Sequence, residues 1–494
     1  MSDNNKNSNI QKNKKRPLSA SKVGKGNGCT LYKKCGGCQL QNMTYPEQLS
    51  FKQVKAIRSL GSFGHVEEII GMENPTHYRN KVQAAFGYRN GRIISGVYQS
   101  SSHNIVPVNE CMLEDKVADS IIVSIRRLLP KYKLTTYNED TGRGFLRHVL
   151  VKRSFATAQT MVVLVSGTPL FPKKEEFVKE LLTLHGEITT VIHNINGAKT
   201  SLVLGEKEIV LYGDGYIEDR LCGKTFRISA KSFYQINPLQ TQVLYGKAIE
   251  FADLTGNERV LDAYCGTGTI GIVASDAAKE VIGVELNEQA VRDARVNAKL
   301  NKVDNIRFFT ADAGKFMVEA AKAGETFDTV FMDPPRAGSD LNFLKSVVTL
   351  SPNKIVYVSC NVETQERDLR YLCKNGYRVK KIQPVDMFPH TAHVETVVQL
   401  VRKNPDTHID FEIGLDEFDL AASGAKATCQ EIKDYVLDKF GLKVSSLNIS
   451  QVKTKCGIIE RENYNKCEGR SRVPQCPKEK EKAIINALRH FKMI

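Results

Sequence analysis

Residues 260–272 read VLDAYCGTGTIGI, and this stretch decides the fold. An apolar strand leads into a turn with glycines at 266 and 268, and an apolar helical pattern follows at once. Glycines in such a turn let the backbone approach a ligand closely, and the N-terminus of the next helix favours nearby negative charge. The stretch therefore predicts the first strand, turn and helix of a ligand-binding α/β sheet.

Four further apolar runs follow at regular distances, each separated from the next by a helical pattern. They read VIGVEL (281–286), IRFFTAD (306–312), DTVFMD (328–333) and KIVYVSC (354–360). Short strands that alternate with helices are typical of a parallel, doubly wound sheet. We therefore predict a Rossmann-like α/β domain with a mostly parallel sheet over residues 229–403.

The segments before and after this domain have different sequence patterns. Residues 78–228 alternate as strands do, carry the hairpin signal Asn90-Gly91, and contain one predicted helix over residues 117–129. The last part of the chain has helical patterns near residues 428–440 and 483–491. The predicted parts are a disordered basic arm (1–28), a cysteine-containing, mostly β domain (29–228), the α/β domain (229–403), an acidic linker (404–425) and a basic, mainly helical accessory domain (426–494).

The formal net charge of the 494 residues is +15, and the excess sits at the two ends. Residues 1–28 contribute +6 and residues 426–494 contribute +7, which leaves +2 for the middle. Basic ends on a nearly neutral body indicate a polyanionic partner, most simply a nucleic acid. No run of 18 apolar residues occurs and the first 28 residues hold no apolar signal region, so we expect a cytoplasmic protein without a membrane span. The twelve cysteines are then expected to be thiols, ligands or nucleophiles.

Carboxylates follow two of the predicted strands at the edge where the glycine turn lies. Glu285 ends the second strand and is placed to accept hydrogen bonds from ribose hydroxyls, and Asp312 ends the third and suits an adenine amino group. Since the carboxyl ends of parallel strands meet in one crevice, these residues predict a site for a cofactor that bears a nucleoside.

A thiol stands at the same edge, because Cys360 ends the fifth strand. The plain interpretation is a buried structural cysteine. The chemical interpretation is uracil methylation: C5 of uracil is a poor nucleophile, so a thiolate must add at C6 and a base must later remove the C5 proton. The segment DMFPHTAHVET (386–396) offers Glu395 as that base, and His390 and His393 are expected to position the loop or to contact RNA. The run Asp333-Pro334-Pro335 resembles the motif of enzymes that methylate amino nitrogens. Those enzymes carry an aromatic residue next, where this chain has Arg336, so the sequence argues against N-methylation.

Five motifs, in order, carry a resemblance to a known family: KSFYQIN (231–237), VLDAYCGTGTIGI, DPPRAG (333–338), VYVSCN (356–361) and DMFPHTAHVET. Together they resemble the bacterial RNA uracil-C5 methyltransferases, which are class I S-adenosylmethionine-dependent enzymes. The resemblance implies that Cys360 is the nucleophile and Glu395 the proton acceptor. It also implies that the cofactor and target-base pocket is formed by Gln235, Tyr264, Glu285, Asp312 and Asp333, and that the β domain binds RNA.

Three cysteines follow the basic arm, at positions 29, 35 and 38. Zinc prefers paired C-x2-C knuckles, and this segment has one such pair. In the ribosomal-RNA branch of the family a similar run binds a 4Fe-4S cluster, so the resemblance implies that Cys29, Cys35, Cys38 and Cys111 hold one here and keep the RNA-binding domain folded. Because the transfer-RNA enzymes of the superfamily lack this cluster, the expected substrate is 23S rRNA.

Two alternatives stay open, a tRNA uracil-C5 methyltransferase and a non-catalytic iron-sulfur RNA-binding protein. The sequence also departs from many relatives, which carry a small β-barrel before the cysteines where this chain has 28 polar residues. We expect the basic arm and the accessory domain to replace that module, with SSLNISQVKTKCG (445–457) as a basic helix against backbone phosphates. A monomer is expected.

Overall fold

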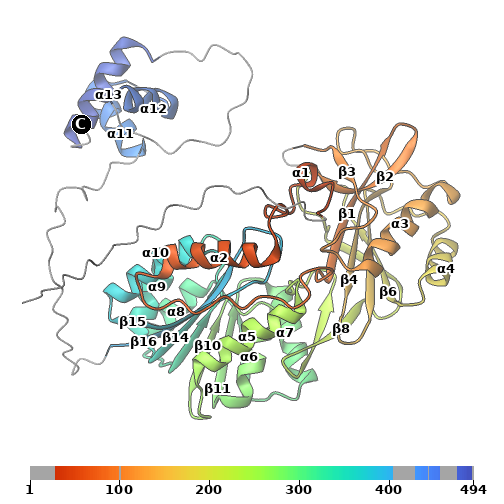
Figure 1. Cartoon of the computed structure of the whole chain (residues 1–494), viewed down its shortest axis with the longest axis horizontal. Helices are drawn as coiled ribbons and strands as arrows, with labels where there is room; N and C mark the ends of the chain where they lie inside the picture. The colour runs from red at the N-terminus through yellow and green to blue at the C-terminus, as the bar shows by residue number, and fades with distance from the viewer. Residues whose placement is uncertain (1–27, 100–101, 404–428, 443, 457–475, 492–494) are drawn as a thin grey trace, which may run out of the picture. The chain divides into compact units, whose positions relative to one another are not determined.

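The computed structural model describes residues 28–99, 102–403, 429–442, 444–456 and 476–491 (Figure 1). The chain divides into two compact units, Met1–Thr407 and His408–Ile494. The predicted basic arm, apart from residue 28, and the predicted linker lie outside the described residues. Among the residues that the structure describes, no helix is long and apolar enough to cross a membrane.

The α/β sheet of the first unit has seven strands in the order β12-β11-β10-β13-β14-β16-β15 (Figure 1). The strands are β10 (Arg259–Ala263), β11 (Glu280–Glu285), β12 (Ile306–Thr310), β13 (Thr329–Met332), β14 (Lys354–Ser359), β15 (Tyr377–Val385) and β16 (Glu395–Arg402). The first five pair in parallel, whereas β16 runs antiparallel to both of its neighbours. The predicted fold class, a mostly parallel doubly wound sheet, is confirmed.

Both faces of this sheet are covered. Neighbouring residues on one strand, such as Val260 and Leu261, enter two separate hydrophobic cores because successive side chains point to opposite faces. One core receives side chains of α5, α6 and α7, and the other those of α8, α9 and α10. The helices are α5 (Pro238–Ala252), α6 (Thr269–Ala274), α7 (Glu288–Leu300), α8 (Ala313–Lys322), α9 (Leu341–Leu350) and α10 (Val362–Lys374).

The second sheet has the order β3-β2-β1-β4-β5-β6-β7. Its strands are β1 (Lys81–Arg89), β2 (Arg92–Tyr98), β3 (Ile105–Pro107), β4 (Leu146–Arg153), β5 (Thr160–Ser166), β6 (Ile188–Ile195) and β7 (Lys207–Tyr212). The predicted hairpin is confirmed, since Asn90 and Gly91 take positive φ angles between β1 and β2. A separate hairpin, β8 (Tyr216–Leu221) and β9 (Lys224–Ser229), follows.

Residues 78–228 contain two long helices, so the prediction of a single helix there is wrong. The predicted helix is α3 (Lys116–Lys131), and the second is α4 (Lys174–Leu184). Helix α4 is present because β5 and β6 run parallel. Parallel neighbours need a crossover connection, and α4 provides it.

The segment before the β domain packs against the other sheet. Helix α1 (Tyr32–Cys35) is a single turn, and α2 (Tyr45–Leu60) starts with a capping box of Thr44 and Glu47. Helix α2 contacts α10 and β15, and the backbone N–H of Glu67 donates to the carbonyl of Ile382. Residues 45–70, which the sequence groups with the β domain, therefore cover one edge of the α/β sheet.

The second unit has three described helices around a small core. They are α11 (Cys429–Phe440), α12 (Ser446–Lys455) and α13 (Lys478–His490). Ile432, Val452 and Ile484 are fully buried in that core. Gly441, at a φ of 65°, ends α11. The helical character expected for this part of the chain is present.

Candidate active site

A pocket opens where the carboxyl ends of β10 and β13 meet. Gln235, Tyr264 and Asp333 line it, so three of the five predicted cofactor residues come together. The rest of the lining is Leu221, Phe233, Tyr234, Tyr245, Cys265, Gly266, Thr267, Thr269 and Ile270. The sequence analysis missed Phe233, which is 66% exposed, although it lies in the same KSFYQIN motif as Gln235.

Unusual backbone angles shape one wall of this pocket. Tyr264, Gly266 and Gly268 have φ angles of 66°, 54° and 80°, in the left-handed region. Glu285 holds the turn, since its carboxylate accepts hydrogen bonds from the backbone N–H groups of Gly266 (3.1 Å) and Asn287 (2.8 Å). A carboxylate has about four acceptor sites, so Glu285 retains capacity for a ligand.

The other predicted carboxylate, Asp312, is exposed and caps α8 by accepting from the backbone N–H of Lys315 at 3.0 Å. It does not line the pocket, and its contact with an adenine stays a prediction.

A buried carboxylate that the sequence analysis missed lies in β10, two residues before Tyr264 of the pocket. Asp262 is 1% exposed and accepts a hydrogen bond from the backbone N–H of Gly271 at 2.8 Å. Burial raises its pKa to about 7, and the charges of Asp333 and Glu285 act in the same direction. Burial likewise raises the pKa of Asp333 to about 7. Asp333, which lines the pocket, and Asp262, which is buried in β10, therefore both have a pKa raised to near neutral pH.

Cys360 and Glu395 lie on neighbouring antiparallel strand ends. Ser359, the last residue of β14, pairs with Thr396, so the next pair along this register joins Cys360 and Glu395. Cys360 is half-buried and Glu395 is 5% exposed. The structure thus brings the predicted nucleophile and the predicted base together, beside Asp333.

Burial governs the protonation of this pair. The pKa of Cys360 is raised to about 11, mainly by burial and in part by the charges of Glu395 and Asp333, while Arg336 lowers it. Burial raises the pKa of Glu395 to about 8, again with Asp333 raising it and Arg336 lowering it. At pH 7 both groups are mostly protonated, and a carboxyl that titrates near 8 is well matched to proton transfer at neutral pH.

Residues 44–403 match the family model described as tRNA (Uracil-5-)-methyltransferase. The chain belongs to this family. An RNA methyltransferase of Clostridium tetani is 44% identical over 374 residues, which cover 75% of this chain and 81% of the relative. An RNA methyltransferase of Listeria innocua is 43% identical over 379 residues, with 76% and 83% covered.

A solved structure gives the same result for the fold of this uracil-5 methyltransferase. The tRNA (uracil-54, C5)-methyltransferase of Pyrococcus abyssi, in complex with S-adenosyl-L-homocysteine, superposes with a TM-score of 0.62 at 30% identity. The superposition covers 74% of this chain and 86% of the archaeal enzyme.

Gly268 in the methyltransferase turn offers a first prediction. A Cβ at this position would lie 2.8 Å from Cζ of Phe308, and the φ of 80° is strained for alanine. We expect Gly268→Ala to lower the free energy of unfolding by about 2 to 4 kcal/mol, through strain and overpacking together. Gly266→Ala is the matched control, because its φ is also positive but nothing lies within 4 Å of the added Cβ. If denaturant unfolding shows equal losses of unfolding free energy in the two variants, Phe308 moves aside without a cost in stability.

The four predicted cysteine ligands are all half-buried. Cys38 and Cys111, 73 residues apart in the sequence, pack against one small cluster of Met72, Tyr78 and Leu113. Burial raises the pKa of Cys38, and nearby Cys35 and Cys29 raise it further through their charges. Yet within the part of the chain that is described, no three Cys, His, Asp or Glu side chains lie close enough to bind one metal ion. Among the described residues the four thiols are therefore not gathered as either a zinc ion or a 4Fe-4S cluster would need them, and the cluster stays a prediction.

Proposed function

We propose that this chain transfers a methyl group from S-adenosylmethionine to C5 of a uridine in 23S rRNA. The observation that carries the proposal is the buried Glu395 beside the half-buried thiol of Cys360, at the carboxyl edge of the doubly wound sheet. A thiol and a carboxyl on one target base are what C5 methylation requires, because the ring needs both a nucleophile and a proton acceptor.

In the proposed reaction the Cys360 thiol and the Glu395 carboxyl each first lose a proton to water. The Cys360 thiolate then adds to C6 of the uracil, and the resulting enolate takes the methyl group at C5. S-adenosylmethionine supplies that methyl group and leaves as S-adenosylhomocysteine. Glu395 then removes the C5 proton, the bond between C6 and sulfur breaks, and the thiolate is regenerated. Since the target base is stacked in folded RNA, it must first be flipped into the pocket.

Gln235, Tyr264 and Asp333 line the pocket and would hold the cofactor. Glu285 and Asp312 would bind its ribose and adenine. The similarity to the archaeal structure supports this assignment, because that enzyme was solved with S-adenosyl-L-homocysteine.

The second candidate substrate is tRNA. It is favoured by the description of the family model and by the tRNA enzyme of Pyrococcus abyssi. The cysteine group favours 23S rRNA, through the resemblance to the ribosomal-RNA branch.

The two candidates are separated by tritium release. The full chain, purified without oxygen, is mixed with S-adenosylmethionine and a transcript made with uridine tritiated at C5. Release from a 23S rRNA transcript and not from tRNA transcripts is the expected result. Release from tRNA alone would replace the first candidate by the second, and no release from either would favour a binding protein without activity.

Cys29, Cys35, Cys38 and Cys111 would bind a 4Fe-4S cluster, which would cross-link the segment before α2 to the β domain. The methyl transfer needs no electron, so the proposed role of the cluster is structural. We expect protein purified without oxygen to contain about four iron and four sulfide ions per chain. We also expect Cys111→Ser to lose most of the iron while the half-buried Cys373→Ser keeps it. Equal iron contents in the two variants would refute this ligand set.

The accessory unit and the basic arm are proposed to contact RNA phosphates. The family match ends at residue 403, so the accessory unit lies beyond the matched region. A monomer in the cytoplasm is part of the same proposal.

A further inference from the structure

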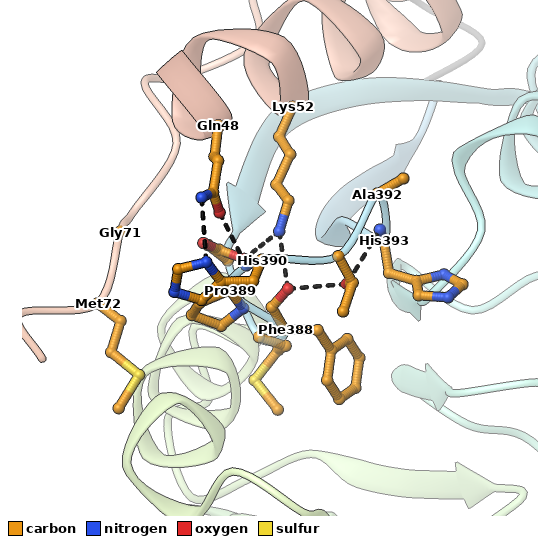
Figure 2. A network of polar contacts seen from close by, with 12 residues as sticks. Gln48, Lys52, Gly71, Met72, Phe388, Pro389, His390, Ala392 and His393 are labelled. Carbon is orange, nitrogen blue, oxygen red and sulfur yellow. Dashed lines mark hydrogen bonds and ion pairs between the residues drawn. The ribbon is translucent and has the colours of Figure 1, made fainter. Parts of the chain in front are cut away.

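The loop that precedes Glu395 is held from one side by helix α2. Residues 386–394 connect β15 to β16. Val385 and Glu395, the residues on either side of this loop, pair with each other. Lys52 of α2 reaches into the loop, where its Nζ lies 2.5 Å from Oδ1 of Asp386 (Figure 2). Both side chains have an exposed fraction of 0%, so this is a fully buried ion pair.

The ammonium group of Lys52 has a second partner in the loop. It donates to the backbone carbonyl of Phe388 at 2.9 Å, and the hydroxyl of Thr391 donates to the same carbonyl at 2.8 Å (Figure 2). The backbone N–H of His393 in turn donates to the Thr391 hydroxyl at 3.3 Å. A continuous series of polar contacts therefore runs from Lys52 to a residue two positions before Glu395.

Two more side chains of α2 fix the same loop. The hydroxyl of Tyr45 donates to Oδ2 of Asp386 at 3.0 Å. The side-chain carbonyl of Gln48 accepts from the backbone N–H of His390 at 2.8 Å (Figure 2). The loop thus has polar contacts to α2 at its beginning and in its middle.

A buried ion pair is a poor source of stability, because the cost of removing two charges from water cancels much of their attraction. What such a pair provides well is a fixed geometry, since moving either group leaves the other charge buried without a partner. Here the fixed geometry belongs to the loop that leads into the proposed base.

We infer that Lys52 and Asp386 are a positioning pair that sets Glu395 for removal of the C5 proton. The inference rests on the proposed function. Cys360 lies outside this loop, between β14 and α10, so the nucleophile itself is not held by the contacts of Lys52 and Asp386. Proton removal does depend on the loop, because an error of about 1 Å in a reacting group can slow a step about 100-fold.

The test is the lifetime of the methylated adduct between RNA and protein. Full-length enzyme in excess is mixed with a labelled 23S rRNA transcript and S-adenosylmethionine, and the reaction is stopped in detergent at a series of times. The RNA that stays bound to protein measures formation and decay of the Cys360 adduct. In the double variant Lys52→Met/Asp386→Asn, which leaves no unpaired charge, we expect normal formation and decay slowed at least about tenfold.

Two reference proteins accompany the double variant. Glu395→Gln removes the proposed base and is expected to accumulate the adduct. Lys55→Met alters a lysine one turn along α2 whose side chain is 31% exposed and pairs with Glu363 at 3.5 Å, and its adduct is expected to decay as in the wild type. Thr391→Val, which removes the hydroxyl that links Phe388 to His393, provides an uncharged variant should the double variant not fold.

Rapid decay in both the double variant and Thr391→Val, with slow decay in Glu395→Gln, would overturn the inference and leave the proposed function in place. Rapid decay in Glu395→Gln would refute the proposed base, and the inference with it. Equal losses of formation and decay in a folded double variant would show a general structural role, which also overturns the inference.

Discussion

Replacing Cys360 with alanine is expected to abolish tritium release from RNA labelled at uracil C5. Without the sulfur no enolate forms, and C5 is too weak a nucleophile to take the methyl group. We expect the rate to fall at least about 1,000-fold, as is typical when a covalent nucleophile is removed. Thermal unfolding should change little, because Cys360 is only half-buried and the substitution removes a single sulfur atom.

The matched control for this prediction is Cys373→Ala. Cys373 is also half-buried and lies on α10, the helix that follows Cys360. Its removal should leave tritium release within about twofold of the wild-type rate. Substantial release by Cys360→Ala would mean that another group attacks C6 or that the reaction is not C5 methylation.

Replacing Glu395 with glutamine is expected to stop the reaction one step later. The thiol of Cys360 is retained, so the methylated adduct should form, but the amide cannot accept the C5 proton. We expect turnover to fall about 100- to 10,000-fold, the range that general base catalysis supplies. The adduct should then persist as a band of protein-bound RNA in a denaturing gel. A variant that turns over normally and leaves no such band would assign the proton to another group.

The same substitution predicts how stability depends on pH. Folding raises the pKa of Glu395 from its ordinary value of 4.5 to about 8, mainly through burial. The folded chain therefore binds more protons than the unfolded chain between these values, and stability is lost as the pH rises through about 8. Glu395→Gln lacks this titration, so the wild type should lose up to about 1.4 kcal/mol per pH unit relative to the variant.

Denaturant unfolding of both proteins at pH 5, 7 and 9 measures this difference. A difference in free energy that stays constant across the three pH values would show that Glu395 is not held in its protonated form by burial.

Local signals in the sequence predicted much of this protein. The run VLDAYCGTGTIGI predicted a strand, a glycine turn and a helix, and the structure places the positive φ angles of Gly266 and Gly268 in that turn. The hairpin at Asn90-Gly91 was equally readable. These features depend on a few adjacent residues, whose backbone preferences do not require the rest of the fold.

The tertiary structure decided what pairs across long distances. Helix α4 was missed because its need arises from the parallel pairing of β5 and β6. Asp262 is an unremarked strand residue in the sequence, and only burial in β10 raises its pKa to about 7.

The sequence by itself determined the doubly wound sheet and the candidate pair of Cys360 and Glu395, because strand periodicity and motif order are local and sequential. It did not reveal that α2 lies over the loop before Glu395, or that Lys52 meets Asp386 from 334 residues away. The physical reason is that a lysine on a helix and an aspartate in a loop are ordinarily solvated. Only the packing that removes both from water makes each the required partner of the other.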